Sequence, residues 1–268
     1  MSPDHFAPPT SNVIQGRLHL KRDLFCLDIN QGCAGFVVGL IQAFMMLEQD
    51  SITRVAVANA DVISRKVSSK DRNVYPLIGD GASITIVEKD TASSSVYANL
   101  KMDGTQRDVL IIPAGGFRLP SSPETAVLED AGDNNFRSKD NLYMDGASVF
   151  NFVQVEVPPM ISDLMDFAKV SSNQVHYYFF HQPNRFMLQK LAEKMKVPPE
   201  KMPSNVVEHF GNSSGVTIPT VITFNFRDRM LSESYMVCLA GFGVGLTWAS
   251  MLMQLGPLEF CEMIDYQN

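Results

Sequence analysis

The sequence has 268 residues, of which 45% are hydrophobic and 19% charged, a composition typical of a globular protein and not of a disordered one. The net charge of -7 argues against general nucleic-acid binding, which needs a basic surface. No run of roughly eighteen apolar residues is free of charges and helix breakers, so we expect no membrane span. The opening MSPDHFAPPT lacks the pattern of a signal peptide, and we expect a cytoplasmic protein.

The cysteines predict free thiols. Cys26, Cys33, Cys238 and Cys261 are scattered along the chain and lack the spacing of a metal site. In a chain without an export signal they are better interpreted as thiols than as a disulfide framework. We therefore expect neither a structural metal nor a disulfide.

In the first half of the chain, the hydrophobic pattern predicts strands around one central helix. Residues 24–30 form a short apolar run typical of a buried strand, and residues 54–60 and 83–88 predict two further strands. Between them, residues 33–49 have helical spacing and are apolar on nearly every face, so we expect protein to cover this helix on all sides. Residues 89–145 contain many turn-forming residues and predict long surface excursions.

Residues 146–268 repeat this plan. We expect, in chain order, a helix over 146–169, a strand over 176–180, a helix over 185–196, a helix whose first turns span 217–226, and strands over 235–240 and 246–255. Pro158 and Pro159 should kink or restart the first of these helices. The alternation of strands and helices predicts an α/β protein with helices covering mixed sheets, divided into residues 1–145 and 146–268.

Cys33 is the strongest candidate for a nucleophile. It stands at the expected start of the central helix, where free backbone N–H groups and the helix dipole favour a thiolate. We therefore expect its pKa to be lowered. The small neighbours Gly32, Ala34 and Gly35 leave room for a substrate carbonyl. The alternative, a buried structural cysteine, is equally consistent with this segment by itself.

His181 and Asn212 are the candidate partners of this thiol. His181 follows an expected strand, where its imidazole can project into a cleft, although a histidine beside aromatic residues is more often a core residue. Asn212 precedes an expected helix and by itself is most simply an N-cap or turn residue. Together with Cys33 they form an ordered set at strand–helix junctions, where α/β folds place their chemistry.

Five short motifs extend this set. They are QGCAGF (31–36), GDGAS (79–83), HQPN (181–184), GNSSG (211–215) and GFGVGLTWAS (241–250). In this order and separation they resemble the signatures of the β-ketoacyl-acyl-carrier-protein synthase III family of the thiolase superfamily, a match that is weakest in residues 89–145. The resemblance implies a five-layered αβαβα fold built from two similar halves, usually as a homodimer.

The same resemblance implies a catalytic triad of Cys33, His181 and Asn212. Cys33 would take the acyl group of an acyl-CoA, which is a substrate and not a cofactor. His181 and Asn212 would then stabilise the enolate formed when malonyl-acyl carrier protein loses carbon dioxide, giving 3-oxoacyl-acyl carrier protein for fatty acid biosynthesis. The backbone N–H groups of Cys33 and Val244 would form the oxyanion hole. The family often has glycine where this chain has Val244.

The resemblance also suggests binding residues outside the triad. Arg72 corresponds to an arginine that stacks on the adenine of CoA, although it could be an ordinary surface arginine. Lys190 and Lys194 lie on a basic helix face that could dock the acidic carrier protein, with an ordinary solvated face as the alternative. Lys194 aligns best with the docking lysines of the family, whereas Arg185 lies one position from the docking arginine.

Compared with the family, this sequence is expected to lack the first quarter of the usual length. That segment normally supplies the first core strands and further CoA contacts, so we expect the N-terminal half to be incomplete. Two alternatives to a condensing enzyme stay open. One is a truncated or non-catalytic partner subunit of a hetero-oligomeric ketosynthase, and the other is an acyltransferase that performs no condensation.

Overall fold

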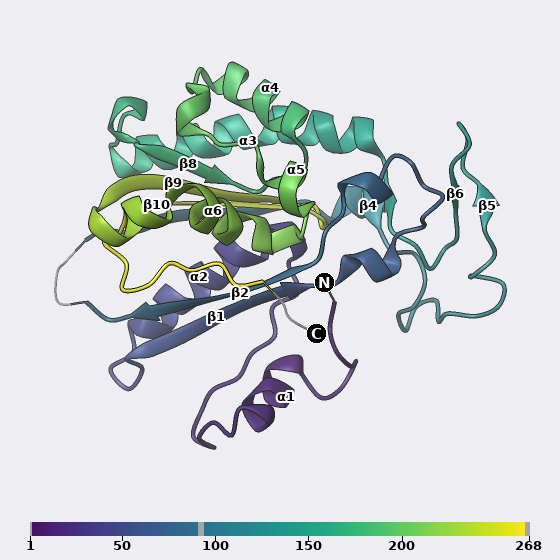
Figure 1. Ribbon diagram of the computed structural model, residues 1–268, viewed down its shortest axis with the longest axis horizontal. Helices are drawn as coiled ribbons and strands as arrows, with labels where there is room; N and C mark the ends of the chain where they lie inside the picture. Colours follow the sequence, from purple (N-terminus) through teal and green to yellow (C-terminus); the bar gives the residue numbers. More distant parts are fainter. Residues whose placement is uncertain (1, 91–93, 266–268) are drawn as a thin grey trace.

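The computed structural model describes residues 2–90 and 94–265, which form a mixed α/β structure (Figure 1). Its helices are α1 (Thr10–Arg17), α2 (Gly35–Leu47), α3 (Gly146–Ala168), α4 (Arg185–Met195), α5 (Val206–Phe210) and α6 (Thr217–Ser232). Its longer strands are β1 (Arg54–Asp61), β2 (Gly81–Glu88), β3 (Tyr97–Met102), β8 (Tyr177–Phe180), β9 (Tyr235–Gly243) and β10 (Thr247–Leu255). Four strands of two residues each are β4 (Leu110–Ile111), β5 (Glu129–Asp130), β6 (Phe136–Arg137) and β7 (Tyr143–Met144).

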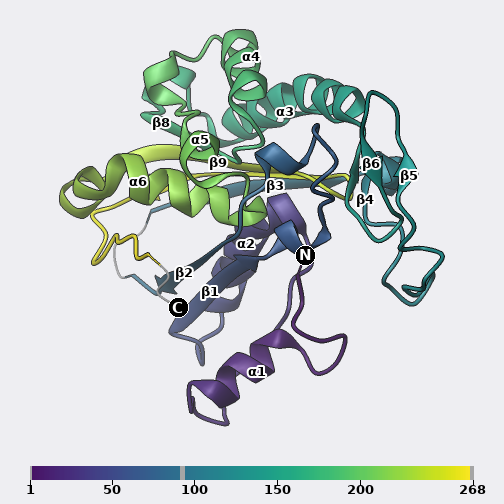
Figure 2. The same ribbon diagram turned by 45° about the vertical axis from the view of Figure 1, so that its right-hand side comes forward.

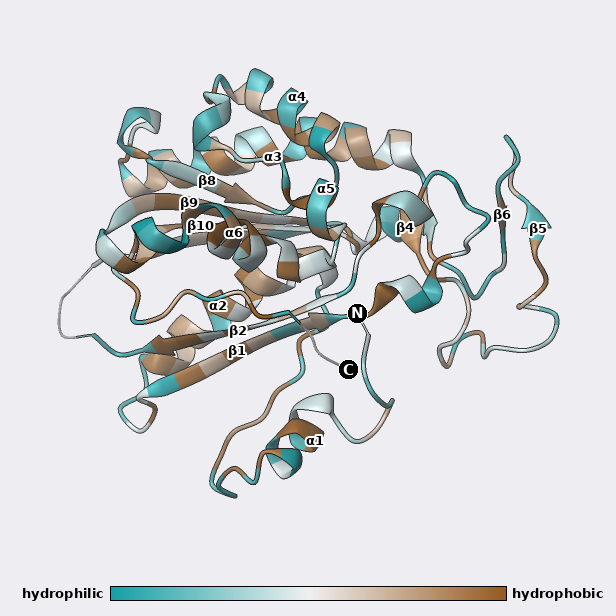
Figure 3. Ribbon diagram, in the orientation of Figure 1, coloured by the Kyte–Doolittle hydropathy of each residue, from teal (hydrophilic) through white to brown (hydrophobic). Residues whose placement is uncertain are grey.

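A four-stranded sheet in the order β3-β10-β9-β8 forms the centre of the protein. β8 runs parallel to β9, whereas β9 and β3 are antiparallel to β10, so the sheet is mixed as expected. β9 is almost entirely hydrophobic along its length (Figure 3). A strand with this composition is buried on both faces of its sheet, and helices cover both faces here.

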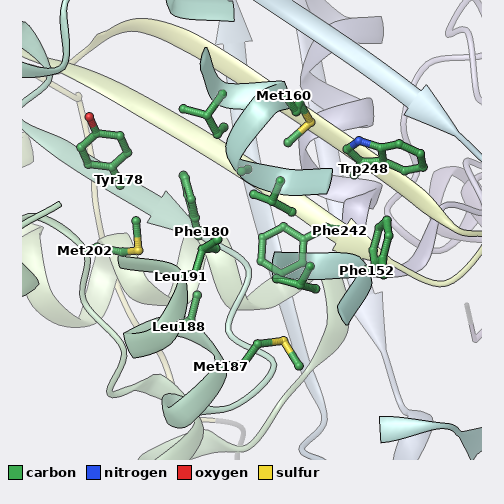
Figure 4. Close-up of a cluster of buried hydrophobic side chains, with 14 of the residues drawn as sticks. Phe152, Met160, Tyr178, Phe180, Met187, Leu188, Leu191, Met202, Phe242 and Trp248 are labelled. Atoms are coloured by element: carbon green, nitrogen blue, oxygen red, sulfur yellow. The ribbon is translucent and has the colours of Figure 1, made fainter. Parts of the chain in front are cut away.

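One face of this sheet packs against α3 and α4. Side chains alternate across a strand, so Tyr178 and Phe180 of β8 point into this layer together with Phe242 of β9 (Figure 4). Trp248 of β10 packs edge-to-face on Phe152 of α3, with ring centroids 5.2 Å apart. The result is one continuous apolar core between the sheet and the two helices.

The other face of the sheet packs against α2 and α6. Phe179, the residue between Tyr178 and Phe180, belongs to this second core, which also reaches Val57 of β1. α2 contacts β1 and β2 on one side and β9 and β10 on the other, and therefore lies between the two sheets (Figure 2). Four layers follow one another: α3 with α4, the four-stranded sheet, α2 with α6, and the antiparallel pair β1–β2. A fold of two similar halves, divided after residue 145, stays a prediction.

Two expectations for the first half are wrong. The described residues 24–30 form no strand and are mostly exposed, because no neighbouring strand pairs with their backbone. The segment instead supports α1, a helix without buried residues: Asp28 accepts hydrogen bonds from the backbone N–H groups of Thr10 (2.7 Å) and Ser11 (2.9 Å). α2 is also not covered on all sides, since Met45 is 60% exposed.

Two further elements differ from the predictions. Residues 97–102, expected to be irregular, form β3, whose alternating side chains pair antiparallel with β10. α3 does not restart at Pro158 and Pro159 but continues through them as a single helix, and the alternative expectation of a kink stays a prediction. The predicted strands 54–60 and 83–88, and the strands and helices of the second half, are confirmed with end points shifted by a few residues. Among the described residues, no helix is long and apolar enough to cross a membrane.

Two distant loops cross close to the ends of β2 and α6. Ile78 and Asn212 form an isolated parallel bridge, in which the Asn212 N–H donates to the Leu77 carbonyl (2.6 Å) and the Gly79 N–H donates to the Asn212 carbonyl (3.2 Å). The backbones approach so closely that a Cβ on Gly79 would overlap with the carbonyl of Phe210. Glycine is therefore required at Gly79 for the crossing that holds Asn212 in place.

We predict that Gly79→Ala lowers the free energy of unfolding by about 1–3 kcal/mol, because the added methyl group forces the two backbones apart. Urea unfolding measures this change. The matched control is Gly104→Ala, since a Cβ at Gly104 meets no atom within 4 Å. The control should stay within about 0.5 kcal/mol of the wild type. Equal stability of the two variants would show that the crossing tolerates a side chain.

Candidate active site

Cys33, His181 and Asn212 line one cavity, although they lie far apart in the sequence. The cavity has a volume of about 100 Å³. Its wall is otherwise mostly apolar and includes Leu110, Leu142, Met144, Val149, Val153, Met187 and Phe242. The structure therefore brings the three predicted residues together in an enclosure suited to a small polar group attached to an apolar chain.

Cys33 lies where the first turn of the central helix begins. It belongs to the 3-10 turn η1 (Gly32–Ala34), which leads directly into α2, and only 7% of its surface is exposed. A Cβ on Gly243 at the end of β9 would lie 2.9 Å from the Cys33 sulfur, so only glycine fits at Gly243. The helix start and the strand end together fix the position of the thiol.

The expectation of a lowered pKa at Cys33 is wrong. Burial of the thiol, the dominant effect, raises its pKa, and the charge of Asp61 raises it further. Two hydrogen-bond donors act in the opposite direction, the Ser214 hydroxyl and the backbone N–H of Val244. The helix start by itself favours a lowered pKa, whereas the enclosure of the thiol by other elements decides the direction of the shift.

His181 follows β8 and is 2% exposed. Its Nδ1 lies 2.7 Å from the Thr217 hydroxyl, and its ring packs edge-to-face on Phe242. Burial lowers the pKa of His181 to about 3, because the charged imidazolium would lose its hydration. The imidazole is therefore neutral near pH 7 and can offer one donor or one acceptor on each nitrogen.

Asn212 is oriented by the loop that follows it. Its side-chain oxygen accepts a hydrogen bond from the Ser214 N–H (2.9 Å), which is the turn role predicted for an asparagine at this position. Because the oxygen is engaged in this way, the side-chain NH₂ group remains to donate to a ligand. Asn212 can therefore be a turn residue and at the same time a hydrogen-bond donor to a ligand.

Ser214 and Thr217 are the residues at this site that the sequence analysis missed. The Ser214 hydroxyl lies 3.8 Å from the Cys33 sulfur. The Thr217 hydroxyl accepts a hydrogen bond from the Gln182 N–H (3.1 Å), as well as meeting His181. Ser214 lies in the GNSSG motif and Thr217 two residues after it, so hydroxyl groups in and near this motif were the available signal, although serine and threonine are common in any turn.

The predicted binding residues outside the triad do not line this cavity. Arg72 is exposed, and its backbone N–H donates to Asn135 (2.8 Å). The ammonium group of Lys190 pairs with Glu193 (2.7 Å), whereas that of Lys194 donates to the Gln154 carbonyl of α3 (2.6 Å). Arg185 pairs with Glu208. The basic face of α4 is therefore partly engaged in exposed pairs, each of which contributes little to stability.

No cluster of metal ligands is present among the described residues, and all four cysteines are free thiols. The chemistry that this arrangement can support is nucleophilic. A buried thiol can attack a carbonyl, and a neutral imidazole and an amide can donate hydrogen bonds to an oxygen that gains negative charge. These are the requirements of acyl transfer through a covalent thioester.

Comparison with known proteins gives a consistent result. The sequence model for 3-oxoacyl-(acyl-carrier-protein) synthase III matches residues 27–104, and the model for the C-terminal part of the same enzyme matches residues 165–255. A putative 3-oxoacyl-(acyl-carrier-protein) synthase 3 of Campylobacter jejuni is 30% identical over 268 residues, covering 99% of this chain and 73% of the relative.

Solved structures agree with the sequence comparison. The crystal structure of a 3-oxoacyl-(acyl-carrier-protein) synthase III is 34% identical, with a TM-score of 0.91 over 94% of this chain and 75% of that protein. The 3-oxoacyl-(acyl-carrier-protein) synthase of Burkholderia xenovorans is 33% identical, with a TM-score of 0.88 over 97% of this chain and 72% of that protein. The chain thus spans about three quarters of the length of the proteins that it resembles.

The buried neutral imidazole makes stability depend on pH in a defined direction. The pKa of His181 is about 3 in the folded protein and 6.5 for an unperturbed histidine, so between these values the unfolded chain binds a proton that the folded chain does not. Stability from this group is therefore lost as the pH falls. We predict that, when the pH falls from about 7.5 to about 5.5, the free energy of unfolding of the wild type decreases by about 1.4 kcal/mol more than that of His181→Gln.

Urea unfolding at the two pH values measures this difference, and His19→Gln provides the control. His19 is exposed, so its replacement removes a histidine without changing the cavity. The control should keep the full pH-dependent loss of the wild type. If His181→Gln showed the same loss as well, the imidazole would not be held neutral by burial.

Proposed function

Because this chain belongs to the 3-oxoacyl-(acyl-carrier-protein) synthase III family, we propose that it is an acyltransferase that condenses an acyl group with malonyl-acyl carrier protein. The observation that carries this proposal is the meeting of Cys33, His181 and Asn212 in one largely apolar cavity. The apolar wall suits the alkyl part of an acyl group, and the three polar side chains suit its thioester. The product would be a 3-oxoacyl-acyl carrier protein.

The first step transfers the acyl group to Cys33. The sulfur of Cys33 attacks the carbonyl carbon of an acyl-CoA, the new carbon–sulfur bond forms, and the bond to the CoA sulfur breaks. The proton lost from Cys33 ends on the sulfur of the departing CoA. The backbone N–H groups of Cys33 and Val244 would hold the oxyanion during the attack, as the proximity of the Val244 N–H to the thiol supports.

The second step forms the carbon–carbon bond. The malonyl thioester loses carbon dioxide, and the electron pair of the broken bond becomes an enolate. The enolate attacks the acyl group on Cys33, and the Cys33 sulfur leaves. His181 and Asn212 would stabilise the enolate oxygen by hydrogen bonds, because the Asn212 oxygen is already engaged with Ser214 and its NH₂ group is available.

His181 can act as the second donor because of its own hydrogen bond. The Thr217 hydroxyl lies within hydrogen-bond distance of both the Ser214 carbonyl (2.9 Å) and Nδ1 of His181 (2.7 Å). The Ser214 carbonyl also accepts from the backbone N–H of Thr217, and we propose that the hydroxyl proton is donated to Nδ1. In that arrangement the proton of the neutral imidazole is on Nε2, which can donate into the cavity. A donor of this kind is typically worth about 3–4 kcal/mol in the transition state.

The remaining expectations from the sequence stay predictions. They are the stacking of Arg72 on CoA, the docking of the carrier protein on Lys190 and Lys194, the homodimer and the cytoplasmic location. Arg72, Lys190 and Lys194 are exposed, and this position supports a role in surface contacts and not in chemistry at the thiol.

We predict that incubation with acyl-CoAs of different chain length adds one acyl group to the protein, at Cys33. Only this cysteine lies in the cavity beside His181 and Asn212, whereas Cys238 and Cys261 are buried in the cores. Intact-mass analysis followed by peptide mapping measures the transfer. Cys33→Ala should take up no acyl group, and Cys26→Ala should behave like the wild type.

The product formed on adding malonyl-acyl carrier protein separates the alternatives. Release of 3-oxoacyl-acyl carrier protein supports condensation, and transfer of the acyl group to another acceptor without loss of carbon dioxide indicates an acyltransferase. An acyl group mapped to another cysteine, or no acylation by any acyl-CoA, would contradict the proposal and leave a non-catalytic subunit.

A further inference from the structure

Ser214 is in contact with all three residues of the site or with their hydrogen-bond partners. Its hydroxyl lies 3.8 Å from the Cys33 sulfur, and its backbone N–H donates to the Asn212 side-chain oxygen (2.9 Å). Its carbonyl lies 2.9 Å from the Thr217 hydroxyl, whose oxygen is 2.7 Å from Nδ1 of His181. Ser214 therefore contacts the thiol through its hydroxyl, the amide through its N–H and, by way of Thr217, the imidazole through its carbonyl.

The backbone of Ser214 adopts a conformation that a serine rarely takes. Its φ is +58°, in the left-handed region where residues other than glycine and asparagine are uncommon. Such a conformation persists when the surroundings require it, and it is common at functional sites. Here it allows the N–H of Ser214 to reach Asn212 while its side chain turns toward Cys33.

The Ser214 hydroxyl has one hydrogen-bond partner in the described part of the chain, the sulfur of Cys33. Only 3% of the surface of Ser214 is exposed, and therefore water does not satisfy this hydroxyl easily. A hydroxyl group carries one proton that it can donate, and a thiolate is a stronger acceptor than a thiol. The contact should therefore strengthen when Cys33 loses its proton.

The thiol needs such a donor. Burial raises the pKa of Cys33 and so disfavours the reactive thiolate, and the charge of Asp61 acts in the same direction. The Ser214 hydroxyl and the Val244 N–H are the two groups that favour the thiolate by hydrogen bonding. The Val244 N–H is expected to turn to the substrate oxygen during the attack, and Ser214 then remains at the sulfur.

We propose that Ser214 is a further catalytic residue, whose hydroxyl donates a hydrogen bond to the Cys33 sulfur whenever that sulfur carries negative charge. This rests on the proposed function, in which Cys33 is a thiolate before acylation and again when it leaves the acyl group. No bond to Ser214 forms or breaks, and its proton stays on its oxygen. The residue acts through the stability of the thiolate.

Alkylation of Cys33 by iodoacetamide tests this inference without any acyl-CoA. The rate at the Cys33 peptide is measured as a function of pH by mass spectrometry, because only the thiolate reacts. We expect the midpoint of the profile to move upward by about one to two pH units in Ser214→Ala and in Ser214→Gly, since a hydrogen bond to a charged group is lost. The control, Ser213→Ala, removes the neighbouring buried hydroxyl and should keep the wild-type profile.

The two variants at Ser214 separate the hydroxyl from the backbone. Both lose the hydroxyl, but glycine adopts a φ of +58° without strain and therefore also guards against a failure of the alanine variant to fold. A shift in both supports the proposal. A shift in Ser214→Ala alone would assign the effect to the backbone, and unchanged profiles in both would show that the hydroxyl does not stabilise the thiolate; either result overturns the proposal.

The experiment distinguishes a failure of this inference from a failure of the proposed function. If no acyl-CoA acylates the protein but the alkylation profile shifts, the condensing activity fails and the role of Ser214 at the thiolate stands. If Cys33 is acylated normally and the profile of both variants is unchanged, the role of Ser214 fails and the proposed function stands.

Discussion

Buried polar groups must be hydrogen-bonded. The loop from Gly211 to Thr217 supplies the partners for the buried polar side chains of the cavity. It provides an N–H group for the Asn212 oxygen and a hydroxyl for Nδ1 of His181. Hydrogen bonds within the protein therefore orient these two side chains. Each of them keeps one donor or acceptor for a ligand, as electrostatic preorganisation requires. The crossing of this loop with Gly79 fixes the loop itself to the body of the protein.

Much of the fold could be predicted because its strands carry a strong local signal. The almost entirely hydrophobic β9 and the alternating β2 have patterns that few other structures share. Residues 24–30 were misassigned because an apolar run indicates a tendency to pair and not the presence of a partner strand. β3 was missed for the opposite reason, since its pairing with β10 depends on a contact between segments about 150 residues apart.

The meeting of Cys33, His181 and Asn212 in one cavity could be predicted from their positions in the sequence, whereas the electrostatics of the cavity could not. Cys33, His181 and Asn212 each stand at a junction between a strand or turn and a helix, and the order of their motifs adds specificity. The direction of the pKa of Cys33 depends on how many other elements enclose it, which no local pattern contains. The same holds for Ser214, whose hydroxyl meets Cys33 across 181 positions of the sequence.

The central claim is that Cys33 takes up the acyl group whereas His181 and Asn212 serve the decarboxylation. Separate measurement of the two half-reactions tests this claim most directly. His181→Ala and Asn212→Ala should still take up an acyl group at Cys33, whereas their decarboxylation of malonyl-acyl carrier protein should fall by a factor of about 10² or more. In the proposed mechanism the thiol attacks without these donors, whereas the enolate depends on them. Wild-type condensation in both variants, or loss of acylation together with condensation, would contradict the account.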